Sequence, residues 1–140
     1  MTIENALFRI QAEVALPADR PLEYYAETLK SVTIGFSLEL DRDCRFDEVP
    51  ALLSDRNGVE LVLFGIPSGE QSDAYLLTLS TRSRKSLSDW RHELAGTFLT
   101  GLLVDKRLAD SGFMDYSEEL AEFFRSHGLP TQKGVEDKST

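Results

Sequence analysis

The stretch VELVLFGIPSGEQSDAYLLTLS, residues 59–80, predicts two strands at the centre of a β-sheet. Residues 59–66 are apolar on both faces, a pattern typical of a strand that is covered on both sides. Residues 74–80 place tyrosine and leucine side chains on one face, and turn-forming residues separate the two segments. We therefore expect an antiparallel hairpin over this stretch.

The segments at the N-terminal end continue the pattern of a sheet combined with helices. Residues 8–16 alternate between apolar and polar side chains, which indicates a half-buried strand, although a helix over residues 3–15 is the alternative. Asp19 and Pro21 are typical of a helix start, and the sequence that follows them repeats its apolar residues at helical spacing. A helix of about 11 residues is expected there.

Two further elements are expected before the central hairpin. Residues 33–40 alternate, which predicts a strand with its apolar side chains turned inward. The inward set is Ile34, Phe36, Leu38 and Leu40. The segment FDEVPALLSDRNG, residues 46–58, predicts a short helix that its Asn-Gly pair ends.

The C-terminal half of the chain is predicted to be mostly helical. Residues 86–108 predict a long helix with a serine cap, although Gly96 and Gly101 leave open whether it is continuous. Residues 114–128 predict a further helix, which a glycine and a proline end. The polar tail, residues 131–140, is expected to be disordered.

These elements together predict an α+β fold for a chain of 140 residues. We expect a single domain over residues 1–130, with a mixed or antiparallel four-stranded sheet packed by two to four helices. The pattern does not determine the strand order.

The composition is acidic, with a formal net charge of −9 and a sequence pI near 4.7. Such a surface repels nucleic acid, and the one short basic patch, TRSRKS, is typical of a solvated loop. The sequence has the pattern of neither a signal peptide nor a membrane span. Its single cysteine, Cys44, cannot form an internal disulfide, so a cytoplasmic location is expected.

Three motifs approach catalytic or metal-binding patterns, and each fails at a required position. His92 and Glu93 begin like the zinc motif H-E-x-x-H, but Gly96 stands where the second histidine belongs. Residues 41–52 lack the glycine and glutamate of a calcium loop, and Ser37 lies within an alternating strand pattern rather than at a nucleophile elbow. We therefore expect no metal, no cofactor and no enzymatic activity.

The function that the sequence favours is a small, acidic, cytoplasmic protein-binding module with a basic protein partner. Within this class, a bacterial toxin-neutralising protein, that is an immunity protein or inhibitor, is preferred on grounds of size and charge. The expected binding residues are Asp41, Asp43, Asp47, Glu48, Glu118, Glu119 and Glu122.

Three alternatives stay open at this point. The first is a secretion chaperone, and the second is an assembly subunit or homodimer that self-associates through Trp90, Phe98 and Leu102 on a nearly all-apolar segment. The third is a small-ligand domain or enzyme that uses His92 or His127 with a tyrosine or a carboxylate.

Overall fold

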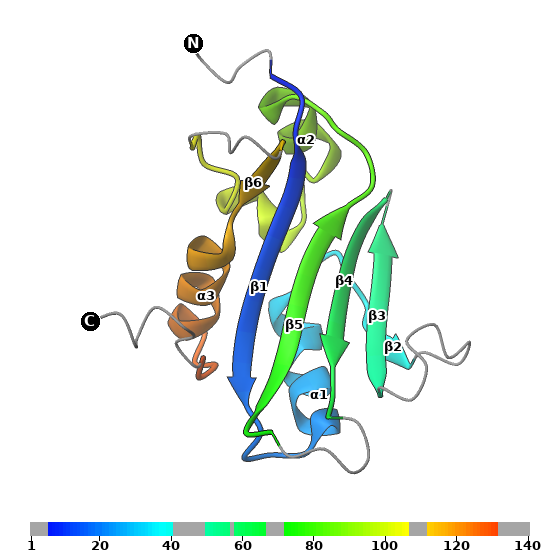
Figure 1. Cartoon of the computed structure of the whole chain (residues 1–140), viewed down its shortest axis with the longest axis vertical. Coiled ribbons are helices and arrows are strands. Elements are labelled where there is room, and N and C mark those ends of the chain that lie inside the picture. The colour runs from blue at the N-terminus through cyan, green and yellow to red at the C-terminus, as the bar shows by residue number, and fades with distance from the viewer. Residues whose placement is uncertain (1–5, 41–49, 57, 67–71, 107–111, 132–140) are drawn as a thin grey trace.

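A computed structural model describes residues 6–40, 50–56, 58–66, 72–106 and 112–131. In this part of the chain, six strands form one sheet in the order β2-β3-β4-β5-β1-β6, with α1 and α2 behind the sheet in the view of Figure 1. The elements are β1 (Arg9–Pro17), α1 (Leu22–Val32), β2 (Glu39–Leu40), β3 (Ala51–Arg56), β4 (Val59–Phe64), β5 (Ala74–Thr81), α2 (Leu87–Glu93), the 3-10 helix η1 (Phe98–Gly101), β6 (Phe113–Asp115) and α3 (Ser117–Ser126). The α+β class is confirmed, but the sheet has six strands rather than four.

The central hairpin is confirmed, because β4 and β5 are adjacent and antiparallel, with Leu61 opposite Leu79. Residues 9–17 form strand β1, so the alternative of a helix at this end is wrong. Every second side chain of β1 is buried, as expected for a strand with one face on the core. The helix predicted after Pro21 is α1, and the helix predicted near Ser117 is α3.

The strand predicted over residues 33–40 is largely wrong, because only Glu39 and Leu40 are in the sheet. The backbone turns before them: Gly35 has a φ of 95°, and the N–H of Phe36 donates to the carbonyl oxygen of Thr33. Phe36 and Leu38 are buried, whereas Ile34 and Leu40 are 62% and 59% exposed. Of the four side chains predicted to face inward, two are therefore buried and two are exposed.

The short helix predicted over residues 46–58 is also wrong within the described residues, which start at residue 50. Ala51–Arg56 is a strand, β3, that pairs with β4 along its whole length. Gly58 follows with a φ of 82°, so the Asn-Gly pair lies between two strands rather than at a helix end. An Asn-Gly pair is the strongest short-range signal for a tight hairpin, and pairing with a buried strand outweighs the weak helix pattern of this segment.

The sequence leaves open whether the helix over residues 86–108 is continuous, and in the structure it is interrupted near Gly96, which has a φ of 84°. Helix α2 has an N-cap at Ser86, whose hydroxyl oxygen accepts from the N–H of Asp89 at 3.2 Å, and it ends at Glu93. The 3-10 helix η1 then begins at Phe98. Positive φ favours glycine strongly, and this explains why the apolar pattern continues while the helix does not.

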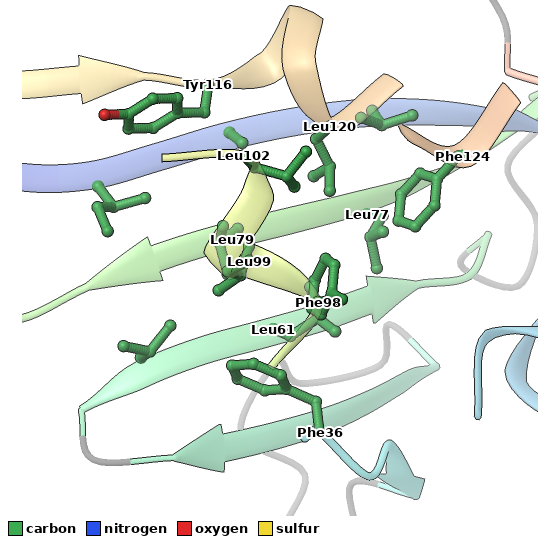
Figure 2. Packing of buried hydrophobic residues seen from close by; sticks show 14 of the residues in the cluster. Phe36, Leu61, Leu77, Leu79, Phe98, Leu99, Leu102, Tyr116, Leu120 and Phe124 are labelled. Carbon is green, nitrogen blue, oxygen red and sulfur yellow. The ribbon is translucent and has the colours of Figure 1, made fainter. Parts of the chain in front are cut away.

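The core lies between the sheet and the layer formed by the helices and η1. Figure 2 shows Leu77 and Leu79 of the sheet packed against Leu99, Leu120 and Phe124 of that layer, and all five side chains belong to one buried cluster. Strand β6, which the sequence pattern did not predict, runs parallel to β1 and leads directly into α3. Strand β1, near the N-terminal end of the chain, is therefore paired with a strand from its C-terminal part.

Two buried tyrosines, one on α1 and one just before α3, each donate a hydrogen bond from the side-chain hydroxyl to a backbone carbonyl oxygen of a connecting segment. The hydroxyl of Tyr25 donates to the carbonyl oxygen of Pro17 at 2.7 Å, and the hydroxyl of Tyr116 donates to that of Val104 at 2.9 Å. Burial raises the pKa of each tyrosine to about 12, and Asp19 adds to the effect at Tyr25.

Raising the pH from 10 to 12 is therefore expected to lower the free energy of unfolding. In this window the unfolded chain releases its tyrosine protons while the folded chain still holds these two, so the unfolded state is favoured. The fall should be less steep in a Tyr25→Phe/Tyr116→Phe variant, which urea titrations at several pH values would measure. Equal slopes for the variant and the parent chain would contradict the assignment.

Candidate functional site

An open groove of about 1000 Å³ lies between helix α1 and the edge of the sheet at β2 and β3. Helix α1, residues 35–40 and β3 line it. The groove exists because the chain turns toward the core at Gly35 instead of continuing β2 along β3. The N–H of Ser37 then donates to the hydroxyl oxygen of Ser54 at 2.9 Å, rather than to a backbone carbonyl of β3.

Four exposed carboxylates line this groove, and they come from three consecutive elements, α1, β2 and β3. They are Glu23, Glu27, Glu39 and Asp55. Glu23 and Glu27 are four residues apart on α1 and so lie on one face of the helix. Two cations, Lys30 and Arg56, line the same groove, which leaves it with an excess of negative charge.

The pKa of Lys30 shows the sign of the local field. A hydrogen bond and ion pair with Glu27, at 2.8 Å, raise the pKa of Lys30 above its usual value, and the charge of Glu39 adds to this shift. Lys30 is therefore paired with Glu27 and lies within the field of Glu39. Glu23 forms no ion pair in the described part of the chain, so its charge is available to an incoming cation.

Asp55 is held in place by two neighbours. Its carboxylate accepts from the guanidinium of Arg82 at 2.8 Å and from the N–H of Gly58 at 3.3 Å. The guanidinium of Arg56 donates to the carbonyl oxygen of Gly35 at 3.3 Å. These contacts join the end of the β3–β4 hairpin to the turn that opens the groove.

A second, smaller cavity of about 350 Å³ lies at the N-terminal end of α1, beside Leu22, Pro50 and Tyr75. Its lining includes proline, glycine and aliphatic side chains, with Glu23 as its one charged residue. It offers few polar groups to orient a ligand, and specific ligand sites require such groups. The larger groove is therefore the better candidate site.

The acidic residues predicted on α3 are less available than their sequence suggests. Glu119 is bound by Lys106 at 2.9 Å, and Glu122 lies 3.2 Å from Arg125. Only Glu118 of this group is exposed without an ion pair in the described chain. The other predicted binding residues, Asp41, Asp43, Asp47 and Glu48, lie outside the described residues.

Trp90, Phe98 and Leu102, named above as self-association residues, are at most 8% exposed. The indole N–H of Trp90 donates to the carbonyl oxygen of Phe8 at 2.9 Å. Phe98 stacks edge-on against Phe36, with 5.6 Å between the ring centroids. Packing within one chain thus accounts for the apolar pattern of residues 98–103, whereas Val104 is 41% exposed.

The two histidines, His92 and His127, are both exposed, and neither lines the groove or the smaller cavity. His127, which follows α3 directly, packs against Phe123 of that helix, with 4.3 Å between the ring centroids. Glu93, beside His92, lies 3.6 Å from Lys85. Among the described residues, no group of three or more His, Cys, Asp or Glu side chains is placed to hold a metal ion, and no helix has the length and apolar character to cross a membrane.

Sequence reasoning missed all four groove carboxylates. The spacing of Glu23 and Glu27 on the polar face of the predicted helix is a usable signal. Glu39 and Asp55 carry no such signal, because their positions depend on a turn at Gly35 and on a strand whose own sequence favours a helix.

Comparison with known proteins adds no family. A scan against protein-family models, a search of curated proteins and a search of solved structures each find no match for this chain.

Proposed function

We propose that this protein is a small binding module that holds a basic protein partner at the acidic groove between α1 and the β2–β3 edge. The observation that carries the proposal is the gathering of Glu23, Glu27, Glu39 and Asp55 around one concave surface. A charged concave surface steers an oppositely charged partner and fixes its orientation. The net charge of −9 gives the whole chain the same preference.

Within this class we favour a toxin-neutralising function, in which the module covers a cationic surface of the partner. An inhibitor needs only a rigid, complementary surface, and the groove is built on a sheet edge and a helix rather than on a long loop. Cationic partners occupy two of the three glutamates of α3 and two of the four groove carboxylates, Glu27 and Asp55. The groove therefore keeps two carboxylates without an ion pair in the described chain, Glu23 and Glu39, whereas α3 keeps one.

Co-purification with matched charge-reversal variants tests this proposal. The groove variant is Glu23→Lys/Glu39→Lys, and the control is Glu118→Lys/Glu122→Lys, which changes the net charge by the same amount. Glu23 and Glu118 both lie in the first turn of a helix, so the cost to helix stability is similar in the two variants.

We expect the parent chain to co-purify with one basic protein in a complex that dissociates as salt is raised. The groove variant should bind this partner at least about tenfold more weakly, corresponding to about 1.4 kcal/mol, while the control should bind nearly as well as the parent. Equal weakening by both variants would show a general charge effect and would remove the groove as the site. Capture of an acidic partner would overturn the proposal itself.

A further inference from the structure

Strand β3 meets the groove along its edge. Five consecutive residues, Leu52 to Arg56, line the groove. Because successive side chains of a strand point to opposite faces, a cavity that touches all five lies beside the strand. Strand β2 covers only part of this edge, where Glu39 pairs with Leu53 and Leu40 with Leu52.

The backbone of Asp55 faces the uncovered part of this edge. The N–H of Gly65 donates to the carbonyl oxygen of Pro50 at 2.7 Å, and alternate residues of an antiparallel strand bond to opposite sides. Asp55, an odd number of residues after Pro50, therefore turns its N–H and C=O toward the β2 side. The β2 register would place Ser37 opposite, but the N–H of Ser37 bonds to Ser54 instead. Within the described chain, no strand pairs with Asp55 on this side.

Arg56 provides a second unmet hydrogen-bonding group at the groove. Its Nε–H is buried and has no acceptor in the described chain, although its terminal nitrogen reaches Gly35. A buried donor without an acceptor is costly.

We infer that the groove takes an extended, cationic segment of the partner, which pairs with the free edge of β3 at Asp55. This inference rests on the proposed function. Addition of a strand to a sheet edge gains affinity from backbone hydrogen bonds and specificity from alternate side chains. Lysine or arginine at these alternate positions would meet Glu23, Glu27 and Glu39 across the groove. A helical segment would keep its backbone groups bonded internally and would leave Asp55 unpaired.

The probe is a blocked octapeptide of alternating lysine and valine, titrated into the ¹⁵N-labelled full chain. A second peptide has the same sequence with every backbone nitrogen methylated, so it keeps its charges but donates no backbone hydrogen bond. We expect the first peptide to shift the amide resonances of Asp55 and its neighbours. The methylated peptide should bind at least about fivefold more weakly, as expected for the loss of one or two hydrogen bonds.

Two matched variants, each with two glutamates replaced by glutamine, show whether the carboxylates of the groove or those of α3 contribute to peptide affinity. Glu23→Gln/Glu39→Gln should weaken the unmethylated peptide about fivefold or more, whereas Glu118→Gln/Glu122→Gln should leave its affinity nearly unchanged. Equal affinity for the two peptides, absence of peptide binding, or shifts confined to α3 would each overturn the edge-pairing inference. The proposed function fails on a separate result, which is that the co-purified partner binds the Glu23→Lys/Glu39→Lys variant as tightly as it binds the parent chain.

Discussion

Replacing Trp90 with alanine is expected to lower the free energy of unfolding by about 3–5 kcal/mol, the usual cost of removing a buried aromatic side chain. Trp90 is fully buried, and it joins α2 to the start of β1 through its hydrogen bond to Phe8. A domain of this size has about 5–15 kcal/mol of stability in total. The variant should therefore unfold at a much lower urea concentration, or be partly unfolded without urea.

Trp90→Phe is the matched control, because it keeps an aromatic ring and removes only the indole N–H and part of the ring. It should cost about 1–3 kcal/mol, because part of the ring packing is lost and the carbonyl oxygen of Phe8 keeps the N–H of Lys85 as its remaining donor. Circular dichroism should follow the unfolding, since Trp90 is the single tryptophan and its fluorescence is lost in both variants.

The dependence of unfolding on protein concentration separates core packing from self-association. If Trp90 stabilises the fold of one chain, the urea midpoint of the parent protein does not change with concentration. A midpoint that rose with concentration and lost this dependence in Trp90→Phe would place the side chain at an interface between copies. That result would contradict the packing described above.

Replacing Gly35 with alanine is expected to cost about 2–4 kcal/mol, from a strained backbone and a steric clash together. The φ of Gly35 is 95°, where a side chain is unfavourable. A Cβ atom would also lie 2.6 Å from Cγ2 of Thr97. Thr97 is buried and its hydroxyl donates to the carbonyl oxygen of Leu94 at 2.8 Å, so it cannot move away freely.

Gly96→Ala provides the control for the backbone alone. Gly96 has a similar φ of 84°, but a Cβ atom there would have no neighbour within 4 Å. It should cost about 1–2 kcal/mol, which is the penalty for the left-handed conformation without the clash. Urea unfolding of both variants gives the difference directly. Equal losses of stability would show that the turn at Gly35 is not packed against Thr97.

The Gly35 variant also links stability to the candidate site. The turn at Gly35 directs the chain away from β3, and the N–H of Phe98 donates to the carbonyl oxygen of Ile34 at 2.9 Å to hold it there. If this turn moved, the groove would lose the lining that Gly35, Ser37 and Leu38 give it. We therefore expect Gly35→Ala, wherever it still folds, to weaken binding of the cationic peptide as well.

The elements that the sequence predicted correctly are those with a strong local pattern. Strand β1 alternates over its whole length, β4 and β5 are apolar segments on either side of a turn-rich loop, and α3 has an apolar and a polar face. Each pattern records which side of the element is buried, and that information lies within a few residues. The class of the fold and the central hairpin followed from it.

The elements that were predicted wrongly had patterns that fit two structures. Strand β3 is short and contains serine, aspartate and arginine, so its own sequence did not distinguish a strand from a helix. Pairing with β4 on one side decided the outcome. Strand β6 has only three residues, which is too few for any periodic pattern.

By itself, the sequence determined the acidic charge, the α+β class and the sides of the long elements that face the core, because these depend on composition and local spacing. The tertiary structure decided which charges act together. It paired the glutamates of α3 with Lys106 and Arg125, and it brought Glu23, Glu27, Glu39 and Asp55 to one groove. The physical reason is that a charge acts through space, within about 8 Å in physiological salt, and the turn at Gly35 and the pairing of β3 set those distances.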